Sequence, residues 1–234
     1  RPQVVETPNE KDSGGESWLI DGRLHGKARN VGADTPKASR EMGDIAARIR
    51  HMDELQVDIQ VLYPTVFLRP FTQRPEIELA LSRSYNRWLV DIWKNGKGRL
   101  RWVAVLPLLT MDKALAEARW AKQNGACGIF IRGLEGDRLL SDPYFYPLYD
   151  EASKLDLPVC VHSATGSFAV HDFFERESGF NKFKLAVVGS FHSVLFEGIP
   201  QRFSKLKLAF IEVSAQWIPY ALHDLVRRFQ RRGK

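Results

Sequence analysis

Four apolar runs in this chain end in residues that could bind or react with a ligand. In chain order these ends carry a phenol at Tyr63, a guanidinium at Arg132, an imidazole at His162 and a carboxylate at Glu212. A neutral imidazole is the commonest metal ligand in proteins and a good general base near pH 7. A carboxylate after an apolar run must find a partner, because removing its charge from water is costly. These four side chains are the first candidates for a functional site.

Each candidate also has a simpler explanation. A single histidine at a strand end, such as His162, can be a structural residue with satisfied hydrogen bonds. Glu212 can form a salt bridge across the site, or it can serve as a metal ligand, a partner of a metal ligand or a general base. Arg132 has a donor fork that suits a substrate carboxylate, but pairing with Glu135 or Asp137 explains it equally well.

The remaining histidines are weaker candidates. His192, in GSFHSVLF, could approach the same site, although packing between helices is its favoured role. His51 and His223 lie in amphipathic segments that predict surface positions, and His25 and His171 are expected in loops.

Alternating strands and helices must position these residues. Apolar runs predict strands within residues 57–64, 100–109, 125–133, 157–163 and 205–214. Segments with helical periodicity or helix-boundary signals cover residues 39–55, 75–95, 111–125, 142–156, 181–204 and 215–232. Ser39 is the expected N-cap of the first helix.

Strict alternation predicts an α/β fold with a parallel sheet, since parallel strands need helical crossovers. An open doubly wound sheet and a closed (β/α)8 barrel both fit this rhythm. No strand is followed by the GxGxxG or GxxxxGK[ST] loop that an open nucleotide-binding sheet usually carries, which favours the barrel. Residues 1–38 are expected to form a loop with a hairpin at ESWLIDGRL, and residues 39–234 a single barrel portion.

Composition excludes several classes of protein. The chain has 234 residues, is 44% hydrophobic and carries a net charge of +6, with much of the excess in RRFQRRGK at its end. It has no basic–aromatic repeat that would stack bases, so nucleic-acid binding is not expected, and no apolar run approaches the roughly 20 residues of a membrane span. Cys127 and Cys160 lie in apolar runs, which predicts buried, reduced thiols in a cytoplasmic protein rather than a disulfide or a metal pair.

Four segments together resemble a known family: HMDELQVDIQVLYPT, GACGIFIRG, LPVCVHSATGS and RFSKLKLAFIEVSAQWIP. They resemble the amidohydrolase superfamily, in particular the amidohydrolase-2 branch that includes aminocarboxymuconate-semialdehyde decarboxylase and related aromatic acid decarboxylases. The resemblance runs from about Arg48 to Pro219. It departs from the usual RFPxLK form at Ser204, where the family has proline.

The resemblance implies a distorted (β/α)8 barrel of the TIM type with one divalent metal ion, usually zinc, at the strand ends. It implies that His162 is a metal ligand and places Glu212 on the sixth strand, in an ExxxxW motif that Trp217 completes. Glu212 is the candidate catalytic residue. The candidates for substrate binding are Trp217, Tyr63, Arg132 and His192. The implied activity is hydrolysis or loss of CO2 from a small carboxylated, possibly aromatic substrate, in an enzyme that is often a homodimer.

The chain also departs from that family. It contains no HxH pair of the kind that the family carries on its first strand, and no predicted strand follows residue 214 to hold the family's last aspartate. We therefore expect strands 2 to 6 of eight, with metal ligands other than His162 outside this chain, which lacks an initiator methionine. The alternative is a catalytically incomplete fragment or a non-enzymatic interaction module with a barrel-like fold.

Overall fold

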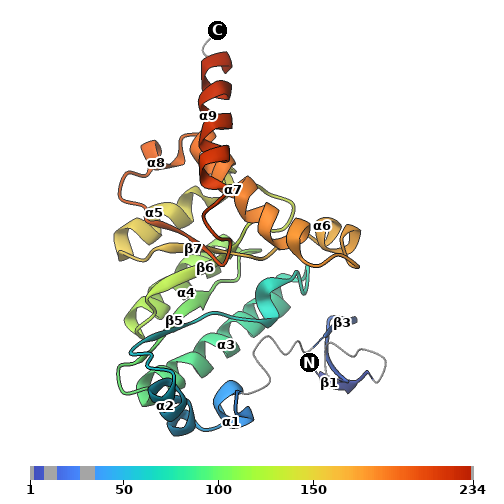
Figure 1. Ribbon diagram of the computed structural model, residues 1–234, viewed down its shortest axis with the longest axis vertical. Helices are drawn as coiled ribbons and strands as arrows, with labels where there is room; N and C mark the ends of the chain where they lie inside the picture. The colour runs from blue at the N-terminus through green and yellow to red at the C-terminus, as the bar shows by residue number, and fades with distance from the viewer. Residues whose placement is uncertain (1–2, 8–14, 27–34, 233–234) are drawn as a thin grey trace.

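The computed structural model of the protein describes residues 3–7, 15–26 and 35–232. A five-stranded parallel sheet runs through its centre (Figure 1). Its strands are β4 (Gln60–Leu62), β5 (Leu100–Val105), β6 (Gly128–Arg132), β7 (Val159–His162) and β8 (Leu208–Ile211), and they lie side by side in that order. The order contains no reversal, and therefore no switch point of the kind that defines a doubly wound sheet. The sheet curls into part of a (β/α)8 barrel, which confirms the predicted fold class.

Helices connect the strands, and most of them pack against one face of the sheet. Those that contribute to the core there are α3 (Pro75–Asn95), α4 (Met111–Gln123), α5 (Tyr146–Leu155), α7 (Ala186–Phe196) and α8 (Ile199–Arg202). The short helix α6 (Phe168–Phe173) lies in the connection from β7 to β8, and α9 (Ile218–Arg232) follows β8 and extends away from the sheet (Figure 1). Short helical turns occupy Val66–Leu68, Pro143–Phe145 and Phe180–Leu185, the last of them a π-helical turn that leads directly into α7. In the described ranges no helix is both long and apolar enough to cross a membrane.

The two faces of the sheet have separate cores, because successive side chains along a strand point to opposite faces. Trp102, Ile129 and Val161 belong to the large core beneath the helices. Val105 and Phe130 face the other way, into a smaller core that includes Phe67 and Cys160. The three middle strands, β5, β6 and β7, are thus covered on both sides, as parallel strands usually are, whereas the edge strands β4 and β8 are partly exposed.

A small antiparallel sheet precedes the barrel portion and is formed by β1 (Gln3–Glu6), β2 (Glu16–Ile20) and β3 (Arg23–Gly26). The predicted hairpin is β2–β3. Its turn residues Asp21 and Gly22 both have positive φ angles, 49° and 78°, as a tight two-residue hairpin turn requires. Strand β1 lies in a polar segment that had no strand pattern, and it forms by pairing with β2.

The helix predicted from Ser39 is divided in two, α1 (Lys37–Arg40) and α2 (Ile45–Glu54). Met42 lies between them with a φ of 55°, which ends the first helix. The cap of the longer helix is Asp44, whose carboxylate accepts the backbone N–H of Ala47 at 3.0 Å. The prediction of Ser39 as the N-cap was therefore wrong, since Ser39 is buried inside α1.

Candidate active site

Neighbouring strands bring the predicted site residues to one edge of the sheet. Arg132 is paired in register with His162, and His162 with Ile211, the residue before Glu212. In parallel barrels the carboxyl ends of the strands are where catalytic groups gather. The register thus places Arg132, His162 and Glu212 on three adjacent strand ends.

His162 and Glu212 form the closest pair of chemically active groups at this edge. The His162 Nε2 atom lies 3.8 Å from a Glu212 carboxylate oxygen, with the imidazole 8% exposed and the carboxylate 59% exposed. Glu212 has a φ of 61°, a left-handed conformation that is unfavourable for a residue with a side chain. His162 and Ile211 are paired and face the same side of the sheet, and strand alternation alone would point Glu212 to the opposite side. The left-handed backbone of Glu212 departs from that alternation, and its carboxylate lies near His162.

The environment of His162 favours a neutral imidazole. Burial lowers its pKa, and the opposing effects of the Glu212 charge and the Ser163 carbonyl are smaller. Nδ1 lies 3.4 Å from the Ser163 carbonyl oxygen. Because a carbonyl only accepts, this contact places the proton on Nδ1 and leaves the Nε2 lone pair facing the space near Glu212. A neutral histidine in this tautomer is suited to bind a metal ion or to accept a proton.

Aromatic rings enclose His162 on its buried side. The ring centroids of Tyr63 and Phe130 lie 5.0 Å and 5.9 Å from that of the imidazole. Burial and a hydrogen bond with Cys160 raise the pKa of Tyr63, so its phenol stays protonated. Cys160 and Cys127 are both free thiols, but only Cys160 is buried, so the predicted burial of Cys127 was wrong. Tyr63 is therefore the predicted substrate-binding residue that the structure places in contact with His162.

Trp217 helps to fix the loop that follows Glu212. Its indole N–H donates to the carbonyl of Val213 at 2.8 Å and to that of Ser214 at 3.2 Å. Its ring packs edge-on against Phe191, with centroids 5.0 Å apart. The ExxxxW motif thus forms one local unit, in which the tryptophan holds the backbone just after the glutamate.

His192 is a residue of α7 that contacts α9. Its Nε2 atom is 3.0 Å from an Asp224 carboxylate oxygen, and its ring stacks on Phe196. These contacts join α7 to α9, which matches the helix-packing role that the sequence favoured for His192. Within the described ranges, none of its hydrogen bonds reaches Tyr63, His162 or Glu212.

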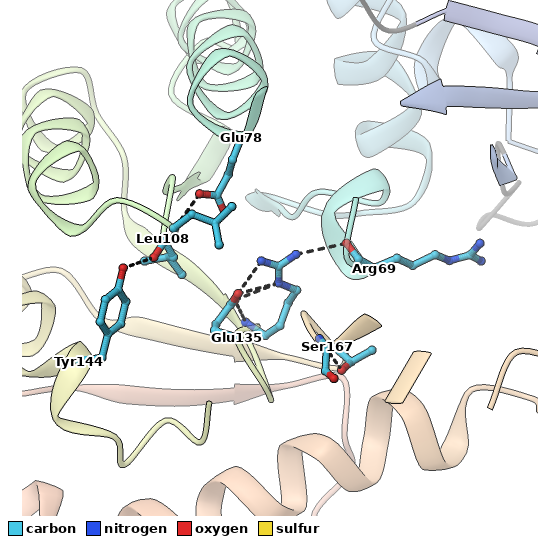
Figure 2. Close-up of polar contacts among 9 residues, drawn as sticks. Arg69, Glu78, Leu108, Glu135, Tyr144 and Ser167 are labelled. Atoms are coloured by element: carbon cyan, nitrogen blue, oxygen red, sulfur yellow. Dashed lines mark hydrogen bonds and ion pairs between the residues drawn. The ribbon is translucent and has the colours of Figure 1, made fainter. Parts of the chain in front are cut away.

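Arg132 is held by Glu135, a carboxylate of its own loop, rather than presented as an open fork. Figure 2 shows Glu135 and Arg69, the two residues that accept from its guanidinium. The Nε of Arg132 donates to both oxygens of Glu135 at 3.0 Å, and its Nη1 donates to the Arg69 carbonyl at 3.2 Å. The two side chains are only 9% and 3% exposed. Pairing with Glu135, one of the two explanations that the sequence left open, is the one that the structure shows.

Sequence reasoning missed Glu78, a buried carboxyl near Arg132 (Figure 2). Glu78 is 4% exposed and accepts the backbone N–H of Leu109 at 2.7 Å. Burial is the largest influence on it and raises its pKa to about 7. In the sequence Glu78 follows Pro75 in the first turn of a helix, where acidic residues are usually exposed and stabilise the helix dipole. The sequence around Glu78 therefore gave no indication that its side chain is buried.

The described residues provide an incomplete set of metal ligands. His162 and Glu212 offer one nitrogen and one oxygen donor on the same side of the site. Within residues 3–7, 15–26 and 35–232, no three His, Cys, Asp or Glu side chains are grouped so that they could hold a metal ion. A catalytic zinc ion normally has three protein ligands. These residues by themselves therefore do not form a complete zinc site.

Residues 21–232 match the protein family described as Amidohydrolase. Among characterised proteins, the chain is 26% identical over 120 residues to a 2-amino-3-carboxymuconate-6-semialdehyde decarboxylase from Dictyostelium discoideum. That alignment covers 51% of this chain and 33% of the relative, so the chain matches about a third of the relative's length.

Solved structures share the fold. An amidohydrolase from Mycobacterium avium subsp. paratuberculosis superposes with a TM-score of 0.73 at 18% identity, covering 98% of this chain and 68% of the other. A dihydroxybenzoic acid decarboxylase from a Polaromonas species, solved with bound manganese and 2-nitroresorcinol, superposes with a TM-score of 0.59 at 17% identity, covering 70% and 52%. At these identities the similarity establishes the architecture of the barrel portion.

Proposed function

Because this chain belongs to the amidohydrolase family, we propose that it is a metal-dependent enzyme that hydrolyses or decarboxylates a small carboxylated, aromatic substrate. The observation that carries the proposal is the His162–Glu212 pair, which lies at adjacent strand ends with 3.8 Å between nitrogen and oxygen. Support for the substrate class comes from the similar proteins, which include decarboxylases of carboxylated aromatic or muconate-type acids.

In this proposal His162 supplies one ligand to a divalent ion, zinc or manganese, through Nε2. The further ligands come from outside the residues that the structure describes. A bound ion of this kind polarises a substrate carbonyl or activates a water molecule. The lowered pKa of His162 supports the role, because a metal ligand must be the neutral imidazole.

Glu212 is proposed to move the proton. Its carboxylate is more than half exposed, so substrate can reach it, and it lies next to His162. As a general base it would take a proton from water in hydrolysis, and as a general acid it would deliver one to the ring carbon that loses CO2. Tyr63, protonated beside His162, is proposed to donate a hydrogen bond to the substrate.

We assign positioning roles to the other predicted substrate residues. Glu135 already neutralises the charge of Arg132, so we propose that Arg132 fixes the strand end next to His162. Trp217 fixes the loop after Glu212, and His192 joins α7 to α9.

Replacing Glu212 with glutamine tests the proton-transfer role. We expect kcat/KM to fall about 100-fold, since removal of a general acid–base group typically costs 10²–10⁴ in rate. The assay is CO2 release from 2,6-dihydroxybenzoate and related carboxylated phenols, with zinc or manganese added. Glu54→Gln, at an exposed position in α2, is the control.

Two outcomes would count against the proposal. An unchanged rate in Glu212→Gln would remove Glu212 from the chemistry. Failure of the native protein to turn over any carboxylated aromatic acid or hydrolysable amide, with either metal present, would contradict the proposed activity.

A further inference from the structure

A cavity of about 510 Å³ opens beside the carboxyl ends of β5 and β6, separate from the His162–Glu212 pair. Ligand pockets typically have volumes of about 300–1,000 Å³. Part of its wall is apolar, and that part includes Phe71, Leu108, Leu109, Phe145 and Phe168. The charged residues that line it are Glu78, Arg132, Glu135, Asp137 and Arg138. Neither His162 nor Glu212 is among the lining residues.

Most of these charges already have partners. Arg132 and Glu135 neutralise each other. Asp137 accepts a hydrogen bond from the Ser167 hydroxyl at 2.7 Å, and the Arg138 guanidinium lies 4.4 Å from the centroid of the Tyr144 ring. Asp137 and Arg138 are both exposed, at the rim of the cavity.

Glu78 is the exception. It is 4% exposed and forms no salt bridge with a described residue, and the charges of Arg132 and Glu135 act on it with opposite signs. Its hydrogen bond comes from a neutral donor, the Leu109 N–H at 2.7 Å. A buried carboxylate without a cationic partner is energetically costly, and a cation in the cavity would remove that cost.

We propose that this cavity binds a small primary amine with an apolar body, whose ammonium group pairs with Glu78 while its hydrocarbon part packs against Phe71, Leu108 and Phe168. Charge favours a cation over an anion. Once Arg132 and Glu135 are paired, Glu78 and Asp137 outnumber Arg138. A carboxylate ligand would lie next to Glu78 and be repelled whenever Glu78 is ionised.

The raised pKa of Glu78 predicts that amine binding in this cavity depends on pH. An ammonium group binds the ionised carboxylate, so affinity should rise as the pH increases through about 7. Between pH 5.5 and pH 8.5 the ionised fraction of such a group grows roughly thirtyfold, whereas an aliphatic ammonium stays charged over that range.

Calorimetric titration with 2-phenylethylamine tests the proposal, with phenylacetate as the anionic compound that carries the same ring. We expect saturable binding of one amine per chain, at least about tenfold tighter at pH 8.5 than at pH 5.5. Glu78→Gln should weaken binding at least tenfold at pH 8.5, while Glu76→Gln, an exposed acid in the same helical turn, should leave it unchanged.

A second variant tests the same site without changing Glu78. Leu109 is 36% exposed and lines the cavity, so Leu109→Lys would place a competing ammonium group there and should abolish amine binding. Tighter binding of phenylacetate than of the amine would overturn the proposal. Full affinity in a folded Glu78→Gln or Leu109→Lys variant would overturn it as well.

Discussion

Replacing Glu135 with glutamine is expected to lower the free energy of unfolding by about 3–5 kcal/mol, because it leaves the Arg132 guanidinium buried without a counter-charge. The side chains of Arg132 and Glu135 are only 9% and 3% exposed. Glu135 accepts from the Arg132 backbone N–H at 2.8 Å as well as from its side chain, so one carboxylate fixes both the strand end and the guanidinium.

Urea unfolding at pH 7 measures this effect. Asp150→Asn is the control, since it breaks an ion pair with Lys154 whose side chains are 57% and 65% exposed, and it should change stability little. The double substitution Arg132→Met with Glu135→Leu should recover much of the loss, because it removes both buried charges. A Glu135→Gln protein as stable as the control would show that Arg132 does not depend on this carboxylate.

Glu78→Gln is expected to stabilise the protein in a pH-dependent way. The pKa of Glu78 rises from an ordinary value of 4.5 to about 7 in the folded protein. Below pH 4.5 the carboxyl is protonated in both states and carries no penalty. As the pH increases to 7 and beyond, folding must keep the proton or bury the charge, and the penalty grows to about 3 kcal/mol.

Glutamine keeps an acceptor for the Leu109 N–H and has no charge to bury. The variant should therefore match the native protein near pH 4 and exceed its stability by about 3 kcal/mol at pH 8.5. Unfolding curves at pH 4, 6, 7 and 8.5 test this, with Glu76→Gln as the exposed control. A difference between variant and native protein that stays constant with pH would contradict burial of an ionisable Glu78.

Periodicity and boundary residues were enough to predict the order of the barrel elements. The apolar runs became strands because both faces of the sheet are covered, and α3 begins at Pro75 and ends at Asn95 as its boundary residues indicated. Since the carboxyl ends of parallel strands share one edge, the sequence also predicted that His162 and Glu212 lie close together, as they do in the structure.

The rest depended on tertiary contacts that have no local pattern. The left-handed backbone of Glu212 is not marked by a glycine. The burial of Glu78 comes from loops that lie 30 residues further along the chain, at Leu108 and Leu109. The sequence left two partners open for Arg132, and only packing shows that Glu135 holds it.

The central claim is that His162 is a metal ligand of an amidohydrolase-type active site, and the most direct test is the affinity of the purified protein for zinc and manganese. We expect the native protein to bind one divalent ion, and His162→Ala to bind it at least about tenfold more weakly, as loss of a ligand or even of a ligand's supporting partner does. His223→Ala, at an exposed position in α9, serves as the control and should retain native affinity. Equal affinity in the native and His162→Ala proteins, or no binding by either, would contradict the account.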